Sequence, residues 1–448
     1  IIHAGFDDKP GTLKAKLCSR GNILWSKLAY DLDIPLKRIG SLVVALNEDE
    51  VGVLKELRKR GNINGVPDLE IIEDHRKLTE SEPNLNETAR AALLAPTAGI
   101  VSPYDAAIAL AENTKQNGTQ IMFETNVLKI IVEGNSIRGV HTNKGLVEAD
   151  YVVNAAGLFS DEISRMVGVA NLAIVPQKGE YFVFDKSIAN LVNHVLFPVP
   201  TEASKGIVVT RTVDGNLLIG PNANSIYDKA DLSTTRSGLD EVFEGALKLV
   251  PSLCEKKGMA IANYAGLRAV LDVDDFVIKA YDELRGFINL VGIKSPGLTS
   301  SPAIAEMVAH LLDDTGLELR FKEDFYPTRK SIDRSIRQLL VSGTANLIAR
   351  DPLYGHVVCR CEQVTEGEVV EAIKRGATTL DGIKYRTRAG MGRCQGGFCT
   401  PHIVRIISRE LDLSVNEVTK HGGDSKILPY EAKALLQRGM TENDSERR

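Results

Sequence analysis

Four of the six cysteines in this chain lie close together near its C-terminal end. They form two pairs, Cys359-x-Cys361 and Cys394-x4-Cys399. Each pair adjoins the expected start of a helix, where free backbone N–H groups and the helix dipole favour thiolates and sulfides. Four thiolates suit an iron–sulfur cluster. Zinc is the main alternative, although structural zinc sites usually use Cys-x2–4-Cys spacing. Unrelated free thiols and a disulfide are the remaining alternatives.

The residues around these cysteines predict a small helical unit over residues 357–412. Thr365-x-x-Glu368 is a capping box that opens a helix, and a second helix is expected from Thr400 to about Asp412. A basic run without acidic neighbours is either a solvated face, a charge that offsets a cluster, or a dock for an acidic redox partner. The basic residues of this run are Lys384, Arg386, Arg388 and Arg393.

This unit resembles the 2Fe–2S domain of the bacterioferritin-associated-ferredoxin kind. The resemblance rests on the cysteine spacing and on the Gly/Arg-rich run RAGMGRCQGGFC at residues 388–399. It implies that all four cysteines ligate a 2Fe–2S cluster. The implied ligands are Cys359, Cys361, Cys394 and Cys399.

A second stretch suited to chemistry follows the apolar strand expected over residues 287–292. The loop 292–300 is fixed by glycine and proline, and the next helix is expected to be capped by Ser301 and Pro302. A helix N-terminus presents N–H groups and a partial positive charge, which would stabilise the negative charge of a reduced flavin. Taken alone, this pattern is also typical of a generic α/β turn.

The order of several motifs resembles the FAD-dependent D-amino-acid-oxidase/glycerol-3-phosphate-dehydrogenase superfamily over residues 1–345. The opening of the chain resembles the branch that holds glycerol-3-phosphate oxidases and dehydrogenases and L-2-hydroxyglutarate dehydrogenases. The motifs are HAG at 3–5, PGTLKAK at 10–16, YVVNAAG at 151–157, GEY at 179–181, DGN at 214–216, GP at 220–221, YAGLR at 264–268 and the loop 292–300.

The resemblance implies a set of cofactor contacts. Val127 is a candidate for backbone contact with the adenine, and the turn at 155–157 passes close to the FAD. The loop 292–299 lines the flavin ring. The implied FAD-binding residues are Val127, Ala155, Ala156, Gly157, Gly292, Pro296, Gly297, Leu298 and Thr299.

The resemblance also implies catalytic and substrate-binding residues. His3 would accept the proton of a substrate hydroxyl, a role that suits an imidazole. Arg268 would clamp an anionic group, because its planar fork matches a carboxylate or phosphate. Further candidates for the same pocket are Lys178, Tyr181, Arg211 and Ser295.

One motif of the family is missing. The Gly-x-Gly-x-x-Gly turn that holds the FAD pyrophosphate in a βαβ unit does not occur in these 448 residues. In the family it precedes the position of His3, so we expect that a further N-terminal segment belongs to this protein.

Composition limits the classes of protein to consider. The chain carries a net charge of −5, with 43% apolar and 25% charged residues, which predicts a folded protein of two or three domains. No run approaches a membrane span, and the acidic balance argues against nucleic-acid binding by overall charge. We expect a cytoplasmic protein that reaches a membrane only through a partner.

The predicted fold class is α/β and α+β. A FAD-binding domain of the glutathione-reductase-like type is combined with a strand-rich substrate domain and a small C-terminal 2Fe–2S helical domain. The predicted boundaries are 1–41, 97–170 and 283–345 for the FAD-binding domain, 42–96 and 171–282 for the substrate domain, 346–356 for a linker, 357–412 for the 2Fe–2S domain and 413–448 for a tail.

The expected activity is FAD-dependent oxidation of sn-glycerol 3-phosphate to dihydroxyacetone phosphate. Electrons would leave through the 2Fe–2S cluster to a redox partner protein or subunit. The alternatives are oxidation of an L-2-hydroxy acid such as 2-hydroxyglutarate, or of an amino acid or amine. A non-catalytic electron-transfer or iron-sensing subunit is the alternative of a different class.

Overall fold

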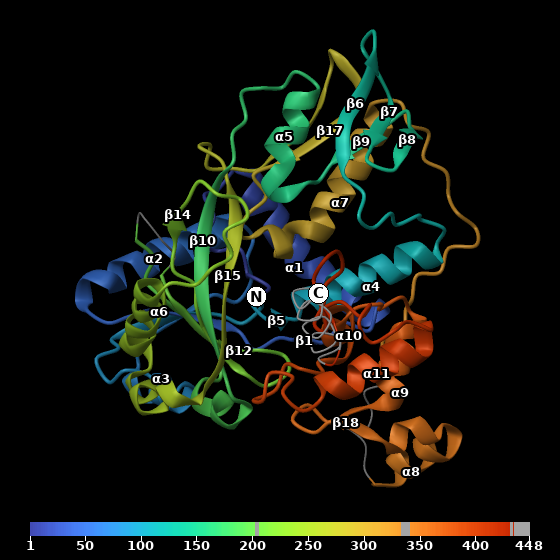
Figure 1. Ribbon diagram of the computed structural model, residues 1–448. Helices are drawn as coiled ribbons and strands as arrows, with labels where there is room; N and C mark the ends of the chain where they lie inside the picture. The colour runs from blue at the N-terminus through green and yellow to red at the C-terminus, as the bar shows by residue number, and fades with distance from the viewer. Residues whose placement is uncertain (202–205, 333–340, 431–432, 434–448) are drawn as a thin grey trace, which may run out of the picture. The chain divides into compact units, whose positions relative to one another are not determined.

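The computed structural model describes residues 1–201, 206–332, 341–430 and 433. The chain divides into two compact units, which we describe one at a time (Figure 1). The first unit holds residues 1–106 and 113–329, and the second holds residues 107–112 and 330–448.

A nine-stranded mixed sheet is the larger sheet of the first unit. Its strand order is β14-β10-β13-β12-β11-β2-β4-β3, and β15 pairs along the whole length of β10. The strands are β2 Ser41–Ala45, β3 Glu70–Ile72, β4 Ala91–Ala95, β10 Val175–Phe184, β11 Val195–Pro198, β12 Val208–Arg211, β13 Leu217–Gly220, β14 Asn224–Ser225 and β15 Ala260–Val270.

The second sheet of this unit has six strands in the order β16-β17-β7-β6, with β8 on β7 and β9 on β17. The strand β17 runs parallel to β9 and β7 and antiparallel to β16. The strands are β6 Val127–Glu133, β7 Ser136–Thr142, β8 Gly145–Glu148, β9 Val152–Asn154, β16 Val277–Tyr281 and β17 Leu284–Val291. The short strands β1 Leu36–Lys37 and β5 Ile100–Val101 pair with each other.

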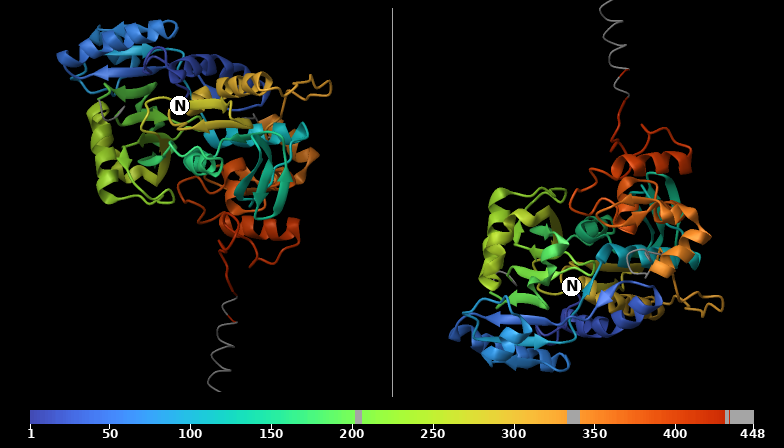
Figure 2. Two further views of the ribbon diagram at one scale, coloured as in Figure 1. Left: turned by 90° about the horizontal axis from the view of Figure 1, so that it is seen from above. Right: turned by 90° about the horizontal axis from the view of Figure 1, so that it is seen from below.

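Helices cover both faces of the nine-stranded sheet (Figure 2). Leu42 and Val44 of β2 pack in one core with helix α6, whereas Val43 and Ala45 pack in another with helix α2. Side chains alternate between the faces of a strand, so β2 is buried on both sides. The α-helices of this unit are α1 Leu13–Asp31, α2 Glu48–Ile63, α3 His75–Ser81, α5 Ser160–Met166, α6 Arg236–Leu249 and α7 Gly297–Asp314. Helix α4 Pro103–Gln116 begins and ends in this unit, and its residues 107–112 are assigned to the second.

Helix α7 begins earlier than its sequence suggests. The pair Ser301-Pro302 resembles a helix start, but α7 begins at Gly297 and Pro302 lies inside it. Proline has no N–H to donate to the carbonyl four residues before it, here that of Leu298. The buried indole Nε1 of Trp25 and the Ser301 hydroxyl donate to that carbonyl instead, at 3.0 and 2.9 Å. These donors allow the helix to start before its proline.

A buried amide pair ties the two parallel strands β9 and β17 together. Asn154 Nδ2 donates to Asn289 Oδ1 at 2.7 Å, and Asn289 Nδ2 donates to Ser164 Oγ and to the Tyr281 hydroxyl, both at 3.0 Å. Both amides are buried, so these bonds replace the water that each group loses. The pair fixes the point at which β9 ends and the turn 155–157 begins.

The second unit is a small helical domain with one short hairpin. Thr365 and Glu368 form the predicted capping box at the start of α9. The segment predicted as a linker, 346–356, carries the end of α8 and a 3-10 helix, because Asp351 caps the turn that follows. The elements are α8 Val341–Arg350, η5 Pro352–Gly355, β18 Val357–Cys359, β19 Val364–Thr365, α9 Glu366–Lys374, α10 Leu380–Thr387 and α11 Thr400–Leu411.

The predicted fold class is confirmed, and the domain boundaries stay predictions. The strands of the predicted substrate domain lie in the nine-stranded sheet, except β16, which pairs with β17 in the other sheet. Of the predicted tail 413–448, residues 431–432 and 434–448 lie outside the described residues. Within the part of the chain that the structure describes, we find no helix with the length and apolarity needed to cross a bilayer.

We predict that Asn289→Ala destabilises the first unit by about 1–3 kcal/mol, because it leaves buried polar partners without a hydrogen bond. Urea unfolding followed by fluorescence of Trp25, the single tryptophan, measures this unit. Asn135→Ala, in an exposed turn, is the matched control and should cost less than about 0.5 kcal/mol. Equal midpoints for the two variants would contradict a structural role for the amide pair.

Candidate functional site

His3 is held by its backbone next to the start of helix α7. Its N–H donates to Thr299 Oγ1 at 2.9 Å, and its carbonyl accepts from Asn22 Nδ2 at 2.7 Å. Its ring Nε2 lies 3.4 Å from Ser295 Oγ, and the half-buried ring packs against Phe197. The structure therefore brings together three residues that the sequence named separately: His3, Ser295 and Thr299.

The loop before α7 and the turn after β9 converge on one apolar cluster. Leu158, Leu271 and Val291 pack together, which joins the turn, the chain after β15 and the end of β17. Gly292 lies directly against Leu271. Two of the segments predicted to surround a flavin, the turn after β9 and the loop before α7, are thus anchored on one cluster.

The strands β10 and β15 present a polar face that carries Arg268. Arg268 is directly opposite Gln177 in the sheet. Its guanidinium donates to Gln177 Oε1 at 3.0 Å and to the Asn222 carbonyl at 3.2 Å. Gly179 leaves the room for this geometry, because a Cβ there would lie 2.6 Å from Arg268 Nη2. The sequence did not single out Gln177 or Asn222, which are joined to Arg268 only by the fold.

Two tyrosines continue the same face of the sheet. Tyr181 and Tyr264 are cross-strand partners whose rings stack with centroids 4.8 Å apart. Burial, together with the neighbouring phenols of Tyr181 and Tyr104, raises the pKa of Tyr264.

Lys178 and Arg211 do not join Arg268. Strand alternation turns Lys178 to the opposite face of β10, where its buried ammonium pairs with Asp231 at 2.8 Å. Arg211 lies opposite Leu217, which pairs with Phe184, seven residues along β10 from the partner of Arg268. Its guanidinium donates to the Asn193 carbonyl at 3.3 Å.

The residues of the first unit fit a flavin in their chemistry. The first turn of α7 offers N–H groups that have no partner inside the helix. Ala155, Ala156 and Gly157 are exposed at the end of β9, so their backbone is accessible. Val127 opens β6, opposite Thr142 of β7, and no contact of this structure tests its role toward adenine.

The four cysteines of the second unit lie together as two pairs of thiols. Cys361 Sγ and Cys394 Sγ are 3.6 Å apart, and the thiols of Cys359 and Cys399 are hydrogen-bonded to each other. Cys359 and Cys399 are buried, Cys361 is exposed and Cys394 is half-buried. All four are free of disulfide bonds.

Backbone N–H groups contribute hydrogen bonds to all four of these sulfurs, and for Cys359 and Cys394 the net effect is a lowered pKa. The Cys399 thiol, followed by the N–H groups of Gly390 and Glu362, lowers the pKa of Cys359 to about 6. The N–H of Phe398 contributes most to lowering the pKa of Cys394. These donors favour thiolates, which are the form that binds metal.

The four side chains of this site offer thiol sulfur as their only donor atom. Two pairs of thiols suit a 2Fe–2S cluster, in which each of two irons takes two cysteines.

The basic residues Lys384, Arg386, Arg388 and Arg393 of this unit make different contacts. Arg388 is buried and pairs with the buried Glu362 at 2.8 Å, so it holds the cysteine loops together. Arg386 donates to the Arg375 carbonyl, and Lys384 lies over the Tyr385 ring. Arg393 is exposed.

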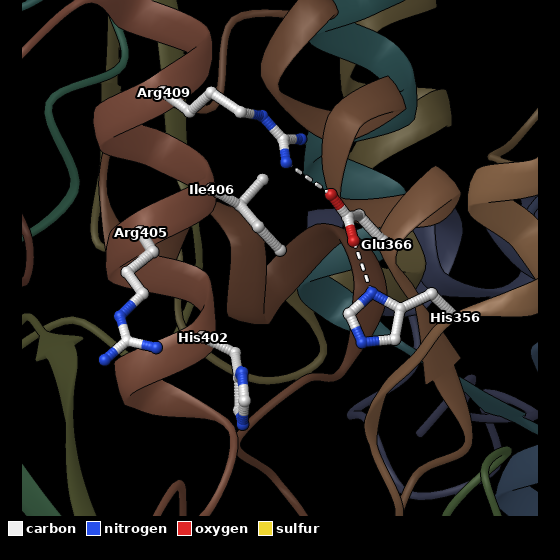
Figure 3. A pocket seen from close by; sticks show the side chains of 6 residues that line it. All are labelled: His356, Glu366, His402, Arg405, Ile406 and Arg409. Atoms are coloured by element: carbon white, nitrogen blue, oxygen red, sulfur yellow. Dashed lines mark hydrogen bonds and ion pairs between the residues drawn. The ribbon is translucent and has the colours of Figure 1, made fainter.

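A polar pocket of about 230 Å³ lies beside α11 (Figure 3). Glu366 sits between Arg409, at 2.6 Å, and the imidazole of His356. These two partners offset the burial of Glu366 and lower its pKa. The pocket is lined by His356, Glu366, His402, Arg405, Ile406 and Arg409.

Two family models match the chain. Residues 1–311 match the FAD dependent oxidoreductase model, and residues 357–409 match the BFD-like [2Fe-2S] binding domain. The second match contains all four cysteines, and the first contains His3, Arg268 and the loop 292–300.

Relatives of known name cover most of the chain. A glycerol 3-phosphate dehydrogenase of Caloramator mitchellensis is 44% identical over 98% of this chain and 90% of its own length. A glycerol 3-phosphate oxidase of Mycoplasma genitalium is 32% identical over 73% of this chain and 86% of its own length. The solved structure of an FAD-bound L-alpha-glycerophosphate oxidase from Mycoplasma pneumoniae is similar with a TM-score of 0.67. It is 28% identical over 73% of this chain and 86% of that one.

We predict that Cys361→Ser and Cys394→Ser each lose at least half of the iron and acid-labile sulfide of the protein, because each removes one of four ligands. Elemental analysis of anaerobically purified protein measures this. Cys254→Ser, at an exposed cysteine of the 3-10 helix η3 Pro251–Met259, should keep the full content. One zinc per chain without iron or sulfide would contradict the cluster.

Proposed function

The chain belongs to the FAD dependent oxidoreductase family, and from this premise we propose that it oxidises sn-glycerol 3-phosphate to dihydroxyacetone phosphate. The names of two relatives, one matching 98% and the other 73% of the chain, support this substrate. The observation that carries the proposal is the position of His3, which is tied to Thr299 and faces Ser295 at the start of α7.

When bound, FAD takes a hydride from the carbon that is oxidised, and a 2Fe–2S cluster takes electrons one at a time. His3 accepts the proton that the substrate hydroxyl releases, and its two backbone hydrogen bonds fix the ring against Phe197. The Ser295 hydroxyl, 3.4 Å from Nε2, orients the imidazole. The first turn of α7 supplies positive potential beside the flavin-binding loop.

Arg268 binds the phosphate of the substrate. Gln177 and the Asn222 carbonyl hold its guanidinium, so that its planar fork is oriented before substrate arrives. Tyr181 belongs to the same face and is retained as a substrate contact. Lys178 and Arg211 are weaker candidates than Arg268, because Lys178 is paired on the opposite face and Arg211 lies at another level of the sheet.

The four paired cysteines hold the cluster, and their two-by-two arrangement supports a 2Fe–2S centre over a structural zinc ion. Electrons then leave to a redox partner protein. Val127 and the turn 155–157 are retained as contacts of the FAD.

We predict that His3→Ala lowers kcat with glycerol 3-phosphate by about 10²–10⁴-fold, because a positioned general base is lost. Dihydroxyacetone phosphate formation under anaerobic conditions, with an artificial electron acceptor, measures the rate. The exposed His75→Ala on α3 is the control and should keep the wild-type rate. An unchanged rate in His3→Ala would remove His3 from the reaction.

We predict that Arg268→Ala raises KM for glycerol 3-phosphate by one to two orders of magnitude, because a charge-assisted hydrogen bond contributes about 1.5–3 kcal/mol. The exposed Arg236→Ala on α6 is the control. Rapid oxidation of L-2-hydroxyglutarate with none of glycerol 3-phosphate would show that the clamp holds a carboxylate.

A further inference from the structure

The cysteines of the second unit differ in exposure, which gives the cluster site an outward edge. Cys359 and Cys399 are buried, whereas Cys361 is exposed and Cys394 is half-buried. The sulfurs of Cys361 and Cys394 are 3.6 Å apart, so the two accessible ligands are neighbours. Electron transfer to another protein is most direct through ligands that the other protein can contact.

A large aromatic side chain stands beside this edge. Phe398 is 79% exposed, although phenylalanine is usually buried. Its backbone N–H donates to the sulfur of Cys394, so its position is tied to the edge itself. Exposed aromatic anchors of this kind are typical hot spots of protein interfaces.

Positive charge surrounds the same edge. Arg360 and Arg393 are exposed and directly precede Cys361 and Cys394 in the chain. The stretch 382–409 contains no Asp or Glu.

Two carboxylates of this unit are held by other cations. Glu362 is buried against Arg388, and Glu366 is held by Arg409 and His356. His402 and Arg405, which line the pocket beside α11 (Figure 3), are exposed.

We propose that Arg360, Cys361, Arg393, Cys394 and Phe398, here called the cluster edge, dock a small one-electron carrier protein with an acidic face. Phe398 enters an apolar dimple of the carrier, and the two arginines meet its carboxylates. The inference rests on the proposed function, which supplies the electrons. One substrate molecule loses two electrons and two protons, so two carriers are each reduced by one electron.

The test uses the holoenzyme and two haem proteins of opposite charge. The acidic soluble domain of cytochrome b5 is the probe, and basic cytochrome c is the comparison. Binding of each oxidised protein is measured by isothermal titration calorimetry at low and high salt. We expect cytochrome b5 to bind more tightly than cytochrome c and to lose affinity as salt rises.

Two variants locate the contact. Phe398→Ala and Arg393→Glu should each weaken cytochrome b5 binding by about tenfold or more. Tyr430→Ala removes another exposed aromatic, and Lys374→Glu reverses another exposed charge of this unit, so both should bind as wild type. The visible spectrum of the cluster should be the same in all four variants, which excludes loss of the fold.

Docking at the cluster edge is overturned if Phe398→Ala and Arg393→Glu bind cytochrome b5 as tightly as the controls, or if cytochrome c binds more tightly than cytochrome b5. Reduction of the flavin by glycerol 3-phosphate is measured separately, without any carrier. A wild-type flavin that does not respond refutes the proposed function, whereas the binding data still decide the docking surface.

Discussion

The close contact between helices α1 and α7 is the constraint on which the proposed oxidation site depends. A Cβ at Gly21 of α1 would lie 2.1 Å from the carbonyl oxygen of Thr299, so only glycine lets the helices approach this far. At this distance Trp25 reaches the Leu298 carbonyl that Pro302 leaves without a helical donor. The same contact places Thr299 where its hydroxyl accepts the N–H of His3. The contact between α1 and α7 therefore positions both the candidate base, His3, and the loop before α7.

The two units differ in how their charged and polar groups are arranged around the candidate sites. In the first, charges near the site are committed in pairs, as Lys178 is to Asp231, and Arg268 is held by neutral oxygens that leave its positive charge available. In the second, backbone N–H groups face the sulfurs of Cys359 and Cys394 and favour the thiolate form. The chain as a whole carries a net charge of −5, yet its exposed cluster edge is basic. This separation suits a protein that takes an anionic substrate in one place and meets an acidic partner in another.

Much of the fold and of both sites could be predicted from local sequence signals, because caps, glycines and cysteine spacing act over a few residues. The capping box at Thr365 and the four cysteines are examples. The start of α7 could not be predicted, since one of the two donors to the Leu298 carbonyl, Trp25, lies 273 residues away from it. The pairing of Asn154 with Asn289 and of Gln177 with Arg268 likewise depends on strand register. The position of Lys178 follows from strand alternation once β10 and β15 are paired.

The central claim is that oxidation at the flavin-side site feeds electrons to the four-cysteine site. Rapid-freeze electron paramagnetic resonance after anaerobic mixing with glycerol 3-phosphate tests it most directly. The account predicts that the flavin absorbance falls first and that the signal of a reduced 2Fe–2S cluster then appears within one turnover. A bleached flavin with no cluster signal, in protein that contains iron and sulfide, would contradict it.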